Sequence, residues 1–165
     1  MSPETRNNND RFADLNASLD GECSSDRQQC GMYATDASVY QIMPKAVVHP
    51  KNTDDIATAI QFASENAMPL LARVAGTSQN GQTVNDAIVI DNSRYFNQLL
   101  ELDVDRARCK VEPGIVLDTL NKQLKPHGLW FPVDVSTASR ATIGGMAGNN
   151  SCGQRSIVYL SLIHI

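Results

Sequence analysis

The sequence lacks the features of a nucleic-acid-binding or membrane-spanning protein. Its 165 residues carry 14 lysines and arginines against 18 aspartates and glutamates, a net charge of −4. Such a balance predicts no basic surface for nucleic acid. No apolar run approaches the roughly 20 residues that a membrane-spanning helix needs, and the N-terminal sequence lacks the charged and then apolar pattern of a signal peptide. We therefore expect a cytoplasmic protein with no transmembrane segment.

Cysteine is scarce and dispersed. Cys23, Cys30, Cys109 and Cys152 form no C-x-x-C pair, so neither a zinc site nor an iron–sulfur cluster is predicted within these residues. No metal ligand is assigned, and we interpret the thiols as reduced and structural. Cys152 is the one thiol that could contact a ligand, because it lies within a glycine-rich segment.

Two common nucleotide-binding motifs are also missing, since the sequence contains neither a P-loop with its lysine nor a G-x-G-x-x-G turn. It has instead two segments of small residues, both expected to be loops: RVAGTSQNGQ at 73–82 and ATIGGMAGNNSCG at 141–153. Gly, Ala, Ser and Thr let backbone N–H groups approach a phosphate closely. The first segment alone is typical of a plain turn, but two such segments together favour a large phosphate-bearing ligand.

The order of expected elements indicates an α+β fold. Apolar runs predict strands at 46–48, 69–72, 87–91, 99–103 and 108–112. Thr53 is expected to cap a helix with Ile56, Ala59, Ile60 and Ala63 on its inner face, and a second helix at 116–124 is expected to stop at Pro126-His127-Gly128. The second of the strands leads directly into the segment at 73–82, an arrangement that aims amides at phosphate.

Three regions follow from this pattern. Residues 1–32 form a polar arm with a short helix around Phe12 and Leu15, and residues 33–159 form the main domain. Residues 160–165 are an anomalous apolar tail with no turn or capping signal, and we interpret the tail as the sign of a truncated chain.

Several stretches resemble the FAD-binding domain of the FAD-linked oxidase family, the PCMH-type domain of the vanillyl-alcohol-oxidase flavoenzymes. They lie at 44–50, 73–82, 111–114, 120–121 and, most specifically, 128–153. The branch that the sequence resembles most is that of the D-lactate and D-2-hydroxyglutarate dehydrogenases, in particular bacterial proteins fused to an iron–sulfur region. The resemblance spans about residues 33–159 and implies an incomplete PCMH-type α+β domain.

The resemblance implies which residues bind FAD. The first segment would wrap the diphosphate with backbone amides, with Arg73 available for charge assistance, and the later residues would line the adenosine, ribityl and flavin parts. Asp134, Ser136 and Ile143 have ordinary alternatives as a turn carboxylate, a turn hydroxyl and a core aliphatic. The candidate set is Arg73, Val74, Ala75, Gly76, Thr77, Ser78, Gly81, Gln82, Pro113, Gly114, Pro132, Asp134, Ser136, Thr142, Ile143, Gly144, Gly145, Asn149, Ser151 and Gly153.

The sequence departs from the family at three places. Val74 and Ala75 stand where consecutive glycines are usual, which would cost about 1 kcal/mol if either position required positive φ. Leu160 stands where a glycine is expected. Thr77 occupies the position of the histidine that tethers FAD in some members, so we expect non-covalent FAD.

The implied activity is that of a flavin-dependent dehydrogenase acting on the CH–OH group of D-2-hydroxy acids such as D-lactate or D-2-hydroxyglutarate. In the family, the base and the carboxylate-binding residues belong largely to a C-terminal cap domain, so no catalytic residue is named and this chain alone is expected to be inactive. An iron–sulfur cluster would belong only to the missing C-terminal region. The particular acid, the electron acceptor and the oligomeric state stay open. The alternatives are a non-catalytic nucleotide-binding module and a non-functional fragment.

Overall fold

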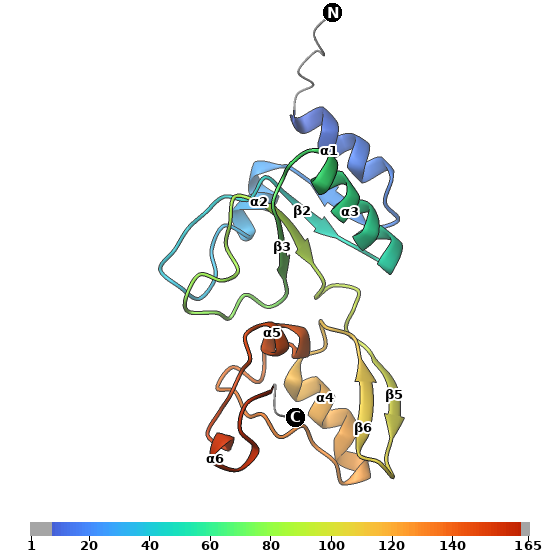
Figure 1. The fold of residues 1–165 in the computed structure, drawn as a ribbon, viewed down its shortest axis with the longest axis vertical. Helices are drawn as coiled ribbons and strands as arrows, with labels where there is room; N and C mark the ends of the chain where they lie inside the picture. The colour runs from blue at the N-terminus through green and yellow to red at the C-terminus, as the bar shows by residue number, and fades with distance from the viewer. Residues whose placement is uncertain (1–7, 163–165) are drawn as a thin grey trace, which may run out of the picture. The chain divides into compact units, whose positions relative to one another are not determined.

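The structure, a computed structural model, describes residues 8–162 and groups them into two compact units (Figure 1). The first unit holds the chain up to Arg73 together with Ser78–Asp91. The second unit holds Val74–Thr77 together with the chain from Asn92 onward. The chain passes between the units after Arg73, after Thr77 and after Asp91. Two of these points follow directly on strands, so no change in amino-acid composition marks the boundaries.

A four-stranded sheet forms the centre of the first unit. Its strands lie in the order β1 (Glu22–Ser24), β2 (Ala46–His49), β4 (Ile88–Asp91) and β3 (Leu70–Arg73). β2, β4 and β3 are parallel, and β1 is antiparallel to β2. Every residue of β2 and β4 is buried, as expected of central parallel strands that are covered on both faces.

Helices cover the two faces of this sheet. On one face, Phe12 of α1 (Asn8–Ala17) and Ala59 of α3 (Thr53–Glu65) pack with Val48 and other strand residues. On the other face, Cys30 of α2 (Arg27–Met32) packs with Val47. Neighbouring strand residues therefore pack in opposite directions, as the pleat of a strand requires.

The second unit is built around a hairpin and a helix. β5 (Leu99–Asp103) and β6 (Arg108–Val111) pair in antiparallel fashion, and α4 (Leu117–Leu124) packs Leu120 against them. The short helix η1 (Lys125–His127) follows α4 and ends at Gly128, which adopts a left-handed φ of 71°. Helices α5 (Ile143–Gly148) and α6 (Ser156–Tyr159) complete the unit.

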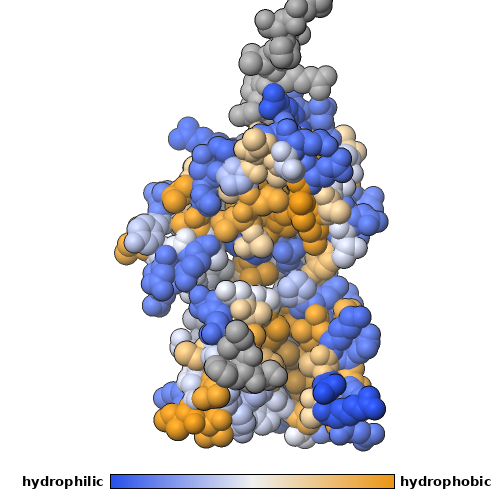
Figure 2. All heavy atoms as spheres, in the orientation of Figure 1, coloured by the Kyte–Doolittle hydropathy of each residue, from blue (hydrophilic) through white to orange (hydrophobic). Residues whose placement is uncertain are grey.

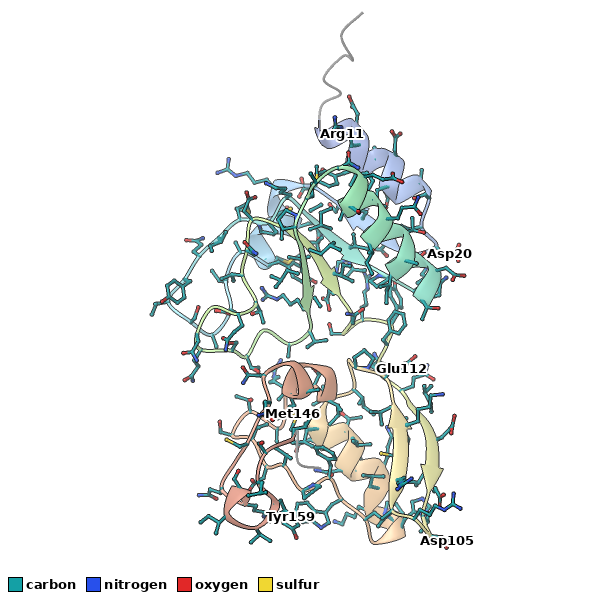
Figure 3. All side chains as sticks on the ribbon, in the orientation of Figure 1. Arg11, Asp20, Asp105, Glu112, Met146 and Tyr159 are labelled. Atoms are coloured by element: carbon teal, nitrogen blue, oxygen red, sulfur yellow. The ribbon has the colours of Figure 1, made fainter. Side chains whose placement is uncertain are left out.

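Met146 of α5, labelled in Figure 3, is buried in a second core cluster with Leu117 and Val133. By contrast, Ile157 and Val158 of α6 are 94% and 73% exposed. Figure 2 shows apolar surface where Figure 1 places α6. Among the described residues, no helix combines the length and the apolar character that crossing a membrane requires.

The alternation of strands and helices predicted from the sequence is confirmed. All five predicted strands form, as β2 to β6, with ends shifted by no more than one residue. Five elements were not predicted: β1, α2, η1, α5 and α6. Because each of them has six residues or fewer, none carries a readable hydrophobic period.

Three local expectations were wrong. Asn52 rather than Thr53 is the N-cap of α3, because its Oδ1 accepts the N–H of Asp55 at 2.8 Å. Ile60 is half exposed, since the buried stripe of α3 runs through Asp55, Ala59 and Ala63 and Ile60 lies at its border. The small-residue segment at 141–153, expected to be a loop, instead contains α5, because Thr142 caps a helix there.

A buried carboxylate ties α3 to the segments before it. Asp55 is 4% exposed, and three backbone N–H groups donate to its oxygens, those of Asp20 at 2.9 Å, Gly21 at 3.0 Å and Lys51 at 2.8 Å. Burial by itself raises the pKa of the Asp55 carboxyl, but these hydrogen bonds and one from the backbone of Asn52 outweigh it, so the pKa is lowered.

This depressed pKa predicts a loss of stability in acid. The contribution of Asp55 is complete above the unfolded-state pKa of about 3.9 and is lost as the pH falls through the folded-state pKa. Replacing Asp55 with asparagine should lower the free energy of unfolding at pH 7 by about 2 kcal/mol and flatten its decline below about pH 4. Urea unfolding at pH 7 and pH 3 measures both effects, with Asp54→Asn, an exposed carboxylate in the same turn, as the control. An Asp55→Asn chain as acid-sensitive as the wild type would contradict this account.

Candidate functional site

The first small-residue segment begins where β3 ends. β3 pairs with β4 up to Arg73, which lies opposite Asp91, and the chain then turns at Gly76, whose φ is 66°. Glycine adopts this left-handed conformation at no steric cost. Within residues 8–162, the backbone N–H groups of residues 74–77 donate to no other group. Four consecutive amides are therefore available to a ligand.

Val74 and Ala75 do not carry the backbone strain that positive φ would impose. Within the described chain, non-glycine residues with positive φ are limited to Ala67, Ala107, Asn150 and Leu160. The side chain of Val74 points instead toward Gly145, where an added Cβ would lie 2.9 Å from Val74 Cγ2. The valine therefore fills space beside α5, and the expected penalty of about 1 kcal/mol does not arise from its φ.

The guanidinium of Arg73 has a structural role. Arg73 is 8% exposed and donates to three backbone carbonyls, those of Tyr33 and Thr83 at 2.9 Å and Thr35 at 2.8 Å. It also lies over the Tyr33 ring, 5.2 Å from the centroid. Burial lowers the pKa of Arg73 from its ordinary value, while the charges of Asp36, Tyr33 and Asp91 oppose that shift. These bonds hold the chain at the point where the first segment begins.

The amides of the second segment are already used inside the protein. The N–H of Ile143 donates to Ile115 O at 3.0 Å, and that of Gly144 donates to Pro113 O at 2.8 Å. Gly145 N–H donates to Oγ1 of Thr142 at 3.3 Å. These three amides at the start of α5 are therefore not available to a ligand, unlike those of residues 74–77, and binding by the first segment stays a prediction.

Two glycines of the second segment, Gly144 and Gly153, are explained by close packing within the chain. A Cβ on Gly144 would lie 2.5 Å from Pro113 Cβ and 2.8 Å from Pro113 O. A Cβ on Gly153 would lie 2.0 Å from the carbonyl oxygen of Asp134. The glycine content did indicate a close approach, but what approaches these two glycines is the protein's own backbone.

An open pocket of about 710 Å³ lies in the second unit. Four predicted residues line it, two from the first segment and two from the later ones: Ala75, Thr77, Gly114 and Thr142. The structure therefore brings part of both small-residue segments to one pocket. Six further lining residues were not predicted: Ser93, Asn97, Val116, Thr119, Ser139 and Arg140.

Sequence signals existed for four of these six residues. Val116 and Thr119 follow the predicted Pro113-Gly114 turn within a few positions, and Ser139 and Arg140 directly precede the second segment. Extending the predicted segments by a few residues would have found them. Ser93 and Asn97 carried no signal, because single polar residues after a strand are common on any surface.

The remaining candidates do not line this pocket. Asp134 accepts the backbone N–H of Arg155 at 3.0 Å, and Ile143 packs in the core around α4. Pro132 and Ser151 are half-buried, and Ser136 and Asn149 are exposed. In the first unit, the hydroxyl of Ser78 bonds to Gln82 and a Cβ on Gly81 would meet the ring of Tyr40.

The pocket has the chemistry of a binding site rather than of a catalytic centre. Among residues 8–162, its lining includes hydroxyls, one amide side chain and one cation, but no aspartate, glutamate or histidine. None of these described side chains can therefore act as a general base near neutral pH. Available amides and hydroxyls next to glycine suit an anionic ligand with several oxygens, such as a phosphate ester.

Comparison with known proteins agrees with this chemistry. Residues 44–164 match the family model described as FAD binding domain. A D-2-hydroxyglutarate dehydrogenase of Pseudomonas putida is 41% identical over 147 residues, covering 87% of this chain and 15% of that protein. A D-lactate dehydrogenase of Archaeoglobus fulgidus is 31% identical over 134 residues, covering 77% of this chain and 30% of that protein. The chain thus spans less than a third of the length of either relative.

The fold is also that of a solved structure. Alkyldihydroxyacetonephosphate synthase matches with a TM-score of 0.81 and 19% identity, over 93% of this chain and 31% of that one. An identity this low supports the fold alone. The expectation of a PCMH-type α+β domain is confirmed by the fold and the family match together, and the chain belongs to the FAD binding domain family.

Proposed function

We propose that this chain forms part of the FAD site of a dehydrogenase that oxidises the CH–OH group of D-2-hydroxy acids, such as D-2-hydroxyglutarate or D-lactate. The observation that carries the proposal is the row of available amides at 74–77, two residues of which line the same pocket as Gly114 and Thr142. The names of the two relatives support the substrate class.

In this proposal, the amides of Ala75, Gly76 and Thr77 bind the diphosphate of FAD, and nearby hydroxyls complete its hydrogen bonds. Gly114 lines the same pocket, and its lack of a Cβ lets it pack against the carbonyl oxygens of Asn92 and Phe96. Arg73 acts as a positioning residue, because its guanidinium already donates hydrogen bonds to three backbone carbonyls. The other candidates inferred from the sequence, from Ser78 to Gly153, stay predictions.

Bound FAD would supply the hydride acceptor for the substrate α-carbon. The residues of this chain would bind and orient the cofactor. The hydroxyl proton of the substrate would pass to a base other than the lining residues that the structure describes, since none of these is a carboxylate or an imidazole. We therefore infer that the chain alone has no dehydrogenase activity. Three points stay predictions: non-covalent FAD, expected because Thr77 replaces the tethering histidine, an iron–sulfur region elsewhere, and the cytoplasmic location. The electron acceptor stays open.

Titration of the purified chain with FAD tests the proposal. We expect saturable binding, seen as quenching of flavin fluorescence, with all flavin released when the protein is precipitated with acid, since no covalent bond is expected. ATP should compete poorly. Preference for ATP over FAD would favour the nucleotide-binding module, and failure to bind either would favour a chain without function of its own.

A further inference from the structure

The walls of the pocket carry an unbalanced positive charge. Arg140 is the one charged residue among the ten that line it, and no carboxylate lies beside it in that lining. The whole chain has a net charge of −4, so the charge of the pocket lining is opposite in sign to that of the protein. A positive pocket is complementary to an anion.

The backbone of Arg140 is held firmly in place. Its N–H donates to the carbonyl of Thr137 at 2.8 Å, and the N–H of Ala141 donates to the same oxygen at 2.7 Å. The carbonyl of Ala141 in turn accepts the N–H of Leu117 at 2.9 Å. Thr142 also pairs with Val116 in an isolated antiparallel β-bridge. The guanidinium is thus carried by a fixed turn that is pinned to α4.

The guanidinium of Arg140 has no partner within residues 8–162: no hydrogen bond, ion pair or ring contact involves it. Other arginines of the second unit differ. Arg155 lies over the Trp130 ring, 4.5 Å from the centroid, and pairs with Asp134 at 3.6 Å. Arg106 pairs with Asp103 at 3.7 Å. Arg140 is therefore an exposed cation in the lining of the pocket, with its backbone held in place and the donors of its guanidinium unused within residues 8–162.

We propose that Arg140 binds the FAD diphosphate and supplies the positive charge that Arg73 cannot supply. This inference rests on the proposed function. A guanidinium can donate two parallel hydrogen bonds to phosphate oxygens, and the amides of Ala75 to Thr77 offer hydrogen bonds but no full charge. Arg140 and the amide row line one pocket, so together they satisfy both the charge and the oxygens of a diphosphate.

The test compares FAD and ADP binding to four purified chains: wild type, Arg140→Gln, Arg140→Lys and Arg106→Gln. FAD binding is measured by fluorescence titration, and ADP binding by competition with FAD, since ADP has the diphosphate but no flavin. Arg140→Gln should weaken both ligands about tenfold, a typical loss for a charged hydrogen bond. Arg140→Lys should lose only about threefold because the charge remains. Arg106→Gln removes the same charge from the hairpin turn and should change neither.

The outcomes separate this inference from the proposed function. Wild-type binding of FAD with no change in Arg140→Gln would overturn the role of Arg140 and leave the proposed function standing. Weaker FAD binding with unchanged ADP competition, or ADP that fails to compete at all, would overturn the assignment to the diphosphate. Wild-type chain that binds no FAD would overturn both. Thermal unfolding of each variant, expected to match the wild type, confirms that binding is compared between folded chains.

Discussion

Replacing Arg73 with methionine is expected to lower the free energy of unfolding by about 3–5 kcal/mol. The substitution keeps a long side chain but removes the donors to the carbonyls of Tyr33, Thr35 and Thr83. Those carbonyls would then lose their partner in a buried environment, and Asp91, also buried, would lose a nearby positive charge. Urea unfolding followed by circular dichroism measures the loss.

Two variants give this result its meaning. Arg106→Met removes an exposed arginine with 76% of its side chain accessible, and surface substitutions of this kind change stability by no more than about 0.5 kcal/mol. Arg73→Lys should fall between wild type and Arg73→Met, because an ammonium cannot reach three carbonyls in the plane of a guanidinium. Equal midpoints for Arg73→Met and Arg106→Met would show that the three hydrogen bonds contribute nothing to stability.

The strands could be predicted because their sequences have one interpretation. Val47 and Val48 in β2 and the run from Ile88 to Ile90 in β4 are β-branched apolar residues, and they are buried on both faces of the sheet. Such runs are typical of central parallel strands. The pairing order β1-β2-β4-β3 could not be derived, because it depends on contacts between residues far apart in sequence.

The site was predicted in part, for a reason that lies in glycine itself. A glycine in the sequence indicates that another group approaches the backbone closely, but it does not indicate whether that group is a ligand or the protein itself. At Gly76 the signal was a left-handed turn that leaves amides available, as expected for a ligand loop. At Gly144 and Gly153 the glycine allows close contact with Pro113 and Asp134. Only the three-dimensional structure distinguishes these cases.

Gly144 in α5 provides the second large effect. A Cβ at Gly144 would overlap Pro113, at 2.5 Å from its Cβ, 2.8 Å from its O and 3.0 Å from its Cα. The proline ring cannot rotate away, and Gly144 N–H donates to the same carbonyl at 2.8 Å, so α5 must shift and weaken this bond. Gly144→Ala is expected to cost about 3 kcal/mol of unfolding free energy, as measured by urea unfolding.

Gly148→Ala is the matched control within the same helix. Nothing lies within 4 Å of a Cβ built at Gly148, and alanine in a helix is more stable than glycine by about 0.5–1 kcal/mol. The same chemical change should therefore be neutral or slightly stabilising there. A loss at Gly148 as large as at Gly144 would mean that α5 tolerates no Cβ for reasons other than the Pro113 contact.

Gly145→Ala tests the contact between the first segment and α5. Its closest obstacle is Cγ2 of Val74 at 2.9 Å, a methyl group that Val74→Ala removes. The double variant should therefore recover most of the stability lost in Gly145→Ala, with a coupling energy of about 1 kcal/mol, whereas Val74→Ala should not relieve Gly144→Ala, whose obstacle is backbone. Additive losses for the Val74 and Gly145 pair would show that the two do not touch in solution. Val74 begins the row of available amides. Such a result would therefore also mean that packing between Val74 and α5 does not hold this row beside Thr142 in the pocket.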